Sequence, residues 1–326
     1  MSFFATLMAL LLEQAKSLSR DNPVYAGVRA WVQWLSRNLD AGEQRHGWLA
    51  WTVAVLLPTA LAMGMHWLLV ALVGWPLAMA WHVLVLYVTL GFRQFSHHFT
   101  RIRHALESGD EDQARQYLAD WQQVHADDLP RREIVRHVIE YSVLAAHRHV
   151  FGVLACYSIG SALGLGPAGA VFFRMAEYAS RFARPSAQAA PLVQGAFETV
   201  AAKAWTVVDW LPSRLTALSF AVVGNFEEAI DGWRFQTQHF PNDNDGVILA
   251  ATAGAIDIRL GGVALRARSG DSDAADALQQ IQGDGATTPG RDPEVAHLRS
   301  VVGLVWRSVV VWMLLLALLT LARLLG

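Results

Sequence analysis

Long stretches without a charged side chain constrain this chain of 326 residues more than any other feature. No charge falls between Trp48 and Val73 or between Val150 and Phe173, and the last 26 residues carry only Arg307 and Arg323. A helix needs roughly 20 apolar residues to cross a bilayer, whereas buried helices of soluble proteins seldom exceed about 14. The three runs therefore predict membrane spans, and the shorter run at 77–92 is marginal.

The composition limits what the chain can bind. Only 17% of its residues are charged, against about 25% in average soluble domains, and 53% are hydrophobic. The formal net charge is −2, so no nucleic-acid partner is predicted, and membrane lipid is the expected neighbour. Cys156 is the single cysteine, which excludes an intramolecular disulfide and a cysteine-based zinc or iron–sulfur site.

Basic residues predict the orientation of the first membrane hairpin. They precede it at Lys16, Arg20, Arg29, Arg37 and Arg45 and follow it at Arg93, Arg101 and Arg103. Two spans separate the groups, so both lie on one side, which the positive-inside rule makes the cytoplasm. Residues 1–12 lack the basic start and the cleavage site of a signal peptide and are interpreted as a retained helix.

The predicted fold class is all-α: a polytopic helical integral membrane protein with a polar helical-hairpin insert. Gly109-Asp110 is expected to end one helix of the insert and to cap the next. Residues 269–295, rich in Gly, Asp, Ser and Pro, predict an exposed loop. The predicted parts are an N-terminal helical arm (1–47), a transmembrane hairpin (48–92), a cytoplasmic helical insert (93–149), a second membrane region (150–224), a polar loop and helix region (225–300) and a C-terminal transmembrane helix (301–326).

Histidines and glycines in the apolar runs each have two interpretations. At His66 and at His82, an uncharged hydrogen-bonded histidine is favoured over a proton or ligand pathway. The segment 147–149 (His-Arg-His) has no acid at ligand spacing, so it is interpreted as interfacial rather than metal-binding. Gly160 and Gly164 have the spacing that lets membrane helices approach closely, and because no G-x-x-x-x-G-K-[ST] sequence occurs, packing is preferred to phosphate binding.

Two polar segments further along are open to a structural or a binding role. Asp209 and Arg214 bracket Pro212, and charge at membrane depth is tolerated where it is paired or lines a cavity. A structural ion pair and anion binding by Arg214 are therefore both open. Residues 242–246 form a predicted polar turn before a glycine-rich helix, which either cradles phosphate or metal or simply turns the chain.

Three segments carry a family resemblance: GLGPAGAVFFRM (164–175), DWLPSRLTA (209–217) and NDGVILAATAGAIDIRLGG (244–262). In this order they resemble the CobD/CbiB family of cobalamin-biosynthesis membrane proteins. The resemblance implies an ATP-dependent ligase that joins adenosylcobyric acid to an aminopropanol phosphate through an amide, giving adenosylcobinamide phosphate. It implies ATP and Mg²⁺ if the chain is that enzyme, a corrinoid or other anionic small molecule as partner, and the bacterial inner membrane as location. No resident cofactor is evident, and a homo-oligomer or a membrane partner stays open.

The chain departs from the family at several acidic positions. Residues 144–149 (LAAHRH) stand where the family has E-N-x-x-D-G, although Glu140 remains upstream. Residues 176–179 (AEYA) replace N-T-L-D, and Trp205-Thr206 replaces a pair of acids. These losses resemble AmpE-like inner-membrane proteins linked to β-lactamase induction, so a non-enzymatic sensor or accessory protein is the alternative function.

A single polar site at the membrane edge is predicted from residues 203–262. The physical reason is that Asp209 and Arg214 are unfavourable at apolar depth unless they are paired or functional. Arg214 is expected to bind a phosphate or carboxylate in bidentate fashion. No catalytic residue and no metal ligand is assigned. The predicted substrate-binding residues are Lys203, Asp209, Arg214, Asn244, Gly246 and Arg259.

The orientation of the hairpin is testable with reporter fusions. A reporter fused after Asn38 and another fused after Asp110 should both report the cytoplasm, because the basic residues on both sides of the hairpin agree. Alkaline phosphatase and green fluorescent protein fusions provide the two complementary measurements. A periplasmic signal from either position would contradict the predicted topology.

Overall fold

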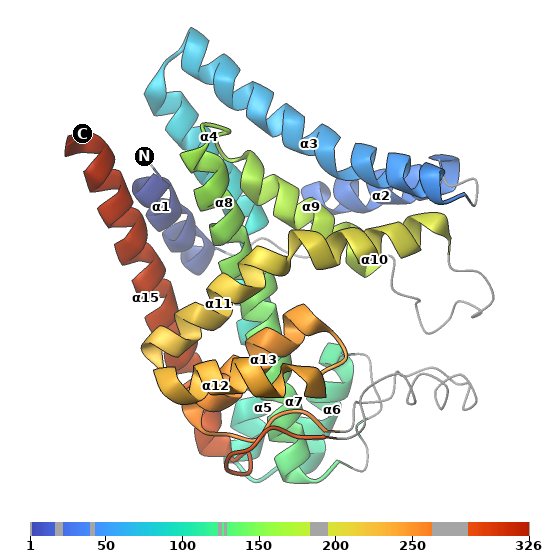
Figure 1. Cartoon of the computed structure of the whole chain (residues 1–326), viewed down its shortest axis with the longest axis vertical. Helices are drawn as coiled ribbons and strands as arrows, with labels where there is room; N and C mark the ends of the chain where they lie inside the picture. The colour runs from blue at the N-terminus through green and yellow to red at the C-terminus, as the bar shows by residue number, and fades with distance from the viewer. Residues whose placement is uncertain are drawn as a thin grey trace. The chain divides into compact units, whose positions relative to one another are not determined.

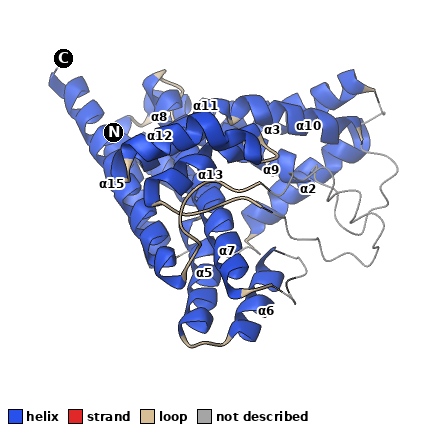
Figure 2. Ribbon diagram, turned by 60° about the horizontal axis from the view of Figure 1, so that its bottom comes forward, coloured by secondary structure: helices blue, strands red, loops and turns tan. Residues whose placement is uncertain are grey.

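The computed structural model describes residues 2–16, 22–39, 43–122, 126, 129–182, 195–262 and 286–325. Every regular element in these ranges is a helix, and the strand-like features among them are two isolated bridges, Ile258 with Arg291 and Gly261 with Thr287 (Figure 2). The predicted all-α class is therefore confirmed. Most of the loop predicted at 269–295 lies outside the described residues, which resume at 286. The chain divides into two compact units, each treated by itself below.

Three of the described helices are long and apolar enough to cross a membrane: Gln44–Leu72, Arg131–Ala162 and Val295–Ala322. Shorter apolar helices cover Ser2–Ala15, Trp75–Thr89 and Trp210–Val223. The helical, membrane-spanning class predicted from the first and last charge-free runs is thus confirmed. Many of the large apolar side chains of these helices are exposed, as expected for a surface that faces lipid.

The apolar run at 150–173 is not a single helix, contrary to the sequence prediction. Gly164 and Gly166 have φ of 78° and 61°, a backbone conformation that favours glycine, and with Pro167 they turn the chain after Ala162. The long helix instead extends backwards to Arg131, into the segment predicted as part of the polar insert. Its two halves, α7 (Arg131–Ala146) and α8 (Gly152–Ala162), are joined by a π-helical turn at His147–Phe151.

The first unit comprises Met1–Phe92, Arg148–Pro212 and Met313–Gly326. Its long helix α3 packs against α2, α4, α9 and α10, and α1 packs on α4 (Figure 1). Leu35, Trp51, Val55 and Phe197 are among the buried side chains where α2, α3 and α10 meet. The helices are α1 (Ser2–Ala15), α2 (Pro23–Leu39), α3 (Gln44–Leu72), α4 (Trp75–Thr89), α8, α9 (Ala168–Phe182) and α10 (Ala196–Val208).

Glycines bring α8 and α9 into backbone contact. A Cβ at Gly160 would lie 3.1 Å from the Gly169 nitrogen, and a Cβ at Gly169 would overlap the Cys156 carbonyl. Gly164 lies beyond the end of α8, where a Cβ would meet nothing closer than 4.0 Å. The close approach predicted from the glycine row is therefore present, but Gly160 pairs with Gly169 rather than with Gly164.

His66 and His82 form a hydrogen-bonded chain with Tyr157. His82 Nδ1 lies 2.9 Å from the Tyr157 hydroxyl and His82 Nε2 lies 3.2 Å from His66 Nδ1. His66 lies six residues before the end of α3 and His82 seven residues after the start of α4, so both lie about 10 Å from the hairpin tip. This row of hydrogen bonds runs across the helices rather than along them. It therefore favours uncharged hydrogen-bonded histidines over a path through the membrane.

Substitution of Gly169 by alanine tests the glycine contact. Because the new methyl group would meet backbone, Gly169→Ala should destabilise the protein by about 1–3 kcal/mol and lower its melting temperature by several degrees. Gly64→Ala is the matched control, since a Cβ there meets nothing within 4 Å in another apolar helix. Thermal unfolding of the detergent-solubilised variants is the measurement, and equal melting temperatures would contradict the packing role.

The second unit comprises Arg93–His147 and Ser213–Trp312. Within it α12 packs along α13, α13 contacts α7, and α6 contacts α7. Gly109, with φ of 82°, ends α5, and the Asp110 carboxylate accepts the Gln113 N–H at 2.9 Å, so the predicted break and cap are confirmed. The helices are α5 (Phe92–Glu107), α6 (Glu111–Gln122), α7, α11 (Trp210–Val223), α12 (Phe226–Gln236), a 3₁₀ turn (Thr237–His239), α13 (Asp243–Ile256) and the first part of α15 (Val295–Leu325).

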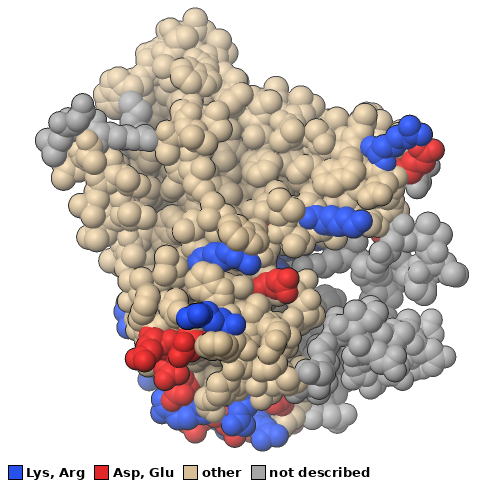
Figure 3. Space-filling model, viewed as in Figure 1, with Lys and Arg blue, Asp and Glu red and all other residues tan. Residues whose placement is uncertain are grey.

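Polar contacts hold the ends of these helices. Arg299 of α15 donates to Glu107 of α5 at 2.9 Å, and this hydrogen bond holds the pKa of the Glu107 carboxyl below its usual value. His147 Nδ1 lies 2.8 Å from the Thr216 hydroxyl and is fully buried, so the predicted interfacial position of His147 is wrong. On the face shown in Figure 3, most charged side chains gather over the second unit, whereas α3, α4 and α8 show almost none.

Candidate functional site

Arg214 and Asn244 meet within the second unit. Arg214 lies in α11 and Asn244 in the first turn of α13, and Arg214 Nη1 donates to Asn244 Oδ1 at 3.0 Å and to Ser213 Oγ at 3.3 Å. Asn244 is buried and Arg214 is partly exposed. The proximity of these two residues, separated by 30 positions in the sequence, was predicted and is present. Their role in binding substrate stays a prediction.

Gly246 belongs to the same helical turn, but it serves packing. The segment predicted as a polar turn is the start of α13, where the Gly246 N–H donates to the Asn242 carbonyl at 2.7 Å. A Cβ at Gly246 would lie 2.8 Å from the Thr237 carbonyl oxygen. Glycine is therefore required here by the close approach of the 3₁₀ turn.

Of the other predicted residues, Arg259 is not brought to this pair. Arg259 follows the last turn of α13, and a helix of 14 residues is about 21 Å long, so Arg259 lies far from Asn244. Its guanidinium instead contacts Asp292 at 3.1 Å and the Gly290 carbonyl at 3.3 Å. Lys203, exposed on α10, and Asp209, buried at the end of α10, belong to the first unit. Within the second unit, the predicted site therefore keeps Arg214 and Asn244 with the adjoining turn at Gly246 and loses Arg259, whereas the part of Lys203 and Asp209 in it stays a prediction.

A charged cluster on α7 was not predicted. Arg136, only 4% exposed, donates to the Glu133 carboxylate at 2.7 Å and to the Glu140 carboxylate at 3.0 Å. Glu140 Oε1 also accepts the backbone N–H of Gly261 at 2.7 Å. The spacing E-x-x-R-x-x-x-E, which places all three side chains on one face of a helix, is the sequence signal that predicts the cluster.

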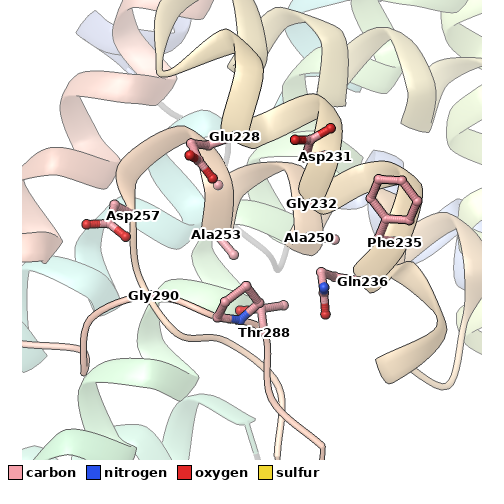
Figure 4. Close-up of a pocket in the computed structure, with 12 residues that line it drawn as sticks. Glu228, Asp231, Gly232, Phe235, Gln236, Ala250, Ala253, Asp257, Thr288 and Gly290 are labelled. Atoms are coloured by element: carbon pink, nitrogen blue, oxygen red, sulfur yellow. The ribbon is translucent and has the colours of Figure 1, made fainter.

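An acidic cleft of about 130 Å³ lies between α12, α13 and the loop at 288–290 (Figure 4). Close contact of α12 with α13 forms its base, because Gly232 and Gly254 let the two backbones touch. Glu228 and Asp231 project from α12, and Asp257 follows the end of α13. Asp257 pairs with Arg291 at 2.8 Å, which leaves Glu228 and Asp231 to make the lining negative.

The structure offers no ready-made metal cage in the part of the chain it describes. No group of three or more His, Cys, Asp or Glu side chains there is placed to hold a metal ion. A magnesium ion, however, is often held by one or two protein carboxylates together with substrate phosphates. A metal that enters with a phosphorylated substrate needs no such group.

Comparison with known proteins gives the family. The model of the CobD/CbiB protein family matches residues 3–287. The cobalamin biosynthesis protein CobD of Stutzerimonas stutzeri (strain A1501) is 29% identical over 285 residues, covering 84% of this chain and 82% of that protein. The protein of the same name from Chromobacterium violaceum (strain ATCC 12472) is 29% identical over 188 residues, 55% of each chain. No solved structure matches the chain.

The match includes all three segments that carry the resemblance, together with α7 and the Arg214–Asn244 pair. With membrane-spanning helices also present, the chain belongs to the CobD/CbiB family of cobalamin biosynthesis.

Proposed function

We propose that this chain is the membrane amide ligase of cobalamin assembly, which joins adenosylcobyric acid to aminopropanol phosphate at the expense of ATP. The observation that carries the proposal is the Arg214–Asn244 contact, which lies within the residues matched by the family. Both phosphate-bearing substrates need a cationic, planar partner, and arginine meets phosphate in bidentate geometry. Asn244 fixes the guanidinium, so less side-chain freedom is lost when a phosphate binds.

The acidic cleft complements the other end of the amine substrate. Aminopropanol phosphate carries a primary ammonium group, which is attracted by the carboxylates of Glu228 and Asp231. A negatively charged lining repels phosphate, whereas Arg214 attracts it. The cleft and the Arg214–Asn244 pair therefore favour opposite charges. The cleft lies roughly 9 to 15 Å along α13 from Asn244, farther than the few ångströms between the two charged ends of aminopropanol phosphate, so one molecule of the amine substrate does not bridge the two sites.

ATP supplies the driving force, because a carboxylate and an amine do not condense unaided in water. Asp243 and Asp245 in the first turn of α13 are the carboxylates nearest in sequence to Asn244, and because residues two apart on a helix point in different directions, one of them would contact a magnesium ion that arrives with the nucleotide. The chain's own part is to hold the phosphate at Arg214 and to orient the amine. This positioning accounts for much of the rate enhancement in many enzymes.

Complementation tests the proposed function. In a strain that lacks its own ligase and grows only with added cobinamide, expression of this chain should restore growth without cobinamide. Arg214→Lys should lose this activity while still inserting in the membrane, because an ammonium cannot form the bidentate contact. Arg307→Lys is the matched control, since Arg307 is an exposed arginine on another apolar helix whose Nε donates to the Gly303 carbonyl at 3.2 Å. Failure of the unmodified chain to complement would contradict the ligase function and favour an accessory role.

Replacement of Asn244 by aspartate tests the charge requirement separately. Asn244→Asp keeps an oxygen that accepts from Arg214 but places a negative charge about 3 Å from the guanidinium. The Michaelis constant of the substrate whose phosphate binds there, ATP or aminopropanol phosphate, should rise about tenfold, equivalent to about 1.4 kcal/mol. Kinetics of the detergent-solubilised variant provide the measurement. Unchanged constants for both substrates would show that no phosphate binds at this pair.

A further inference from the structure

Glu140 connects α7 to the turn at residues 260–262, here called the glycine turn. Gly261 in this turn lies 121 residues from Glu140 in the sequence. Its Oε1 accepts the Gly261 N–H at 2.7 Å, and both of its oxygens accept from Arg136 Nη1, at 3.0 and 3.2 Å. Gly261 and Gly262 have φ of 88° and 100°, which side chains with a Cβ rarely adopt. The carboxylate therefore adds a hydrogen bond from a charged acceptor to a backbone conformation that glycine adopts most readily.

Hydrogen bonds from the glycine turn hold the loop that lines the acidic cleft. The Thr288 N–H donates to the Leu260 carbonyl at 2.8 Å, and the Leu260 N–H donates to the Thr288 hydroxyl at 2.9 Å. The Gly262 N–H donates to the Ala286 carbonyl at 2.8 Å. Thr288 is a lining residue of the cleft and is only 2% exposed, so its position follows from that of Leu260.

Arg136 sets the position of the Glu140 carboxylate. Its guanidinium lies between Glu133 and Glu140, and a Cβ at Gly262 would lie 3.8 Å from its Cζ. Glu133 balances the charge of Arg136 from the other side, but no contact between Glu133 and the turn appears among the described residues. Both carboxylates thus balance the charge of Arg136, and of the two Glu140 contacts the turn.

We propose that Glu140 is a positioning residue that fixes the glycine turn and, through Leu260 and Thr288, the width of the acidic cleft where the amine substrate binds. The contact with the turn follows from the hydrogen bonds alone. The effect on substrate rests on the proposed ligase function. A positioning role of this kind predicts that reach to the Gly261 N–H, rather than negative charge, is the property of Glu140 that matters.

Two conservative variants separate reach from charge. Glu140→Gln keeps the length of the side chain and an oxygen that accepts the Gly261 N–H, but it loses the charge. Glu140→Asp keeps the charge beside Arg136 but is one methylene too short to reach Gly261. Glu133→Gln is the matched control, because it removes the charge of the other carboxylate beside Arg136 and alters no contact with the glycine turn. All three are small changes that leave Arg136 at least one carboxylate partner.

Hydrogen–deuterium exchange of the detergent-solubilised full chain measures the turn without relying on activity. Exchange of peptides that cover Leu260–Gly262 should rise about tenfold or more in Glu140→Asp, as expected for loss of a hydrogen bond to a charged group. It should stay near the unmodified rate in Glu140→Gln and Glu133→Gln. If Glu140→Gln exchanges fast and Glu140→Asp slowly, the residue only balances the charge of Arg136 and the proposal is overturned. Equal exchange in all variants overturns it as well.

Kinetics provide the second arm. In Glu140→Asp the Michaelis constant for aminopropanol phosphate should rise severalfold, with that for ATP unchanged, and Glu140→Gln should restore it. An equal change in both constants would overturn the link to the cleft. If the unmodified chain forms no amide, the ligase function fails, yet the exchange measurement still decides whether Glu140 holds the turn.

Discussion

A helix that enters a bilayer tolerates a charged side chain only where protein supplies the partners, and Arg136 shows how this chain meets that constraint. The guanidinium is almost fully buried, and carboxylates one turn before and one turn after it accept its hydrogen bonds. Because one guanidinium lies between two carboxylates, the loss of either still leaves Arg136 a charged partner. The same arrangement directs the Glu140 carboxylate at the glycine turn, so the compensation of one buried charge also orders a distant loop.

The membrane-spanning helices could be predicted from the sequence where a charge-free run and a helix cover the same residues. This holds for α3 and for α15, whose apolar runs are uninterrupted. It fails for the helix that begins at Arg131, because its first turns are charged, and a search for charge-free runs overlooks that Glu133, Arg136 and Glu140 neutralise one another on one face of the helix. The run at 150–173 misleads for the opposite reason: it is apolar throughout, yet backbone angles at Gly164 and Gly166 turn it.

The candidate site shows a similar division. Arg214 and Asn244 could be paired from sequence because both fall in segments that carry the family resemblance, and because an arginine within an apolar stretch needs a polar partner. Arg259 was misplaced, because α13 begins already at Asp243 and runs to Ile256, so nearly the whole length of this helix separates Arg259 from Asn244. Nor could the cleft, whose acids come from α12 and from the residue after α13 and converge only through the Gly232 and Gly254 contact.

The acids that the family has and this chain lacks bear on where chemistry takes place. At the matched stretch 144–149, His147 is buried against Thr216 in a π-helical turn, so in this chain the stretch holds α7 to α11. The carboxylates of Glu228, Asp231 and Asp257 line a cleft elsewhere in the same unit. Because a carboxylate acts through its charge and its geometry, its position in the fold matters more than its place in the sequence. The second unit thus carries carboxylates in a cleft, although the stretch 144–149 contains none.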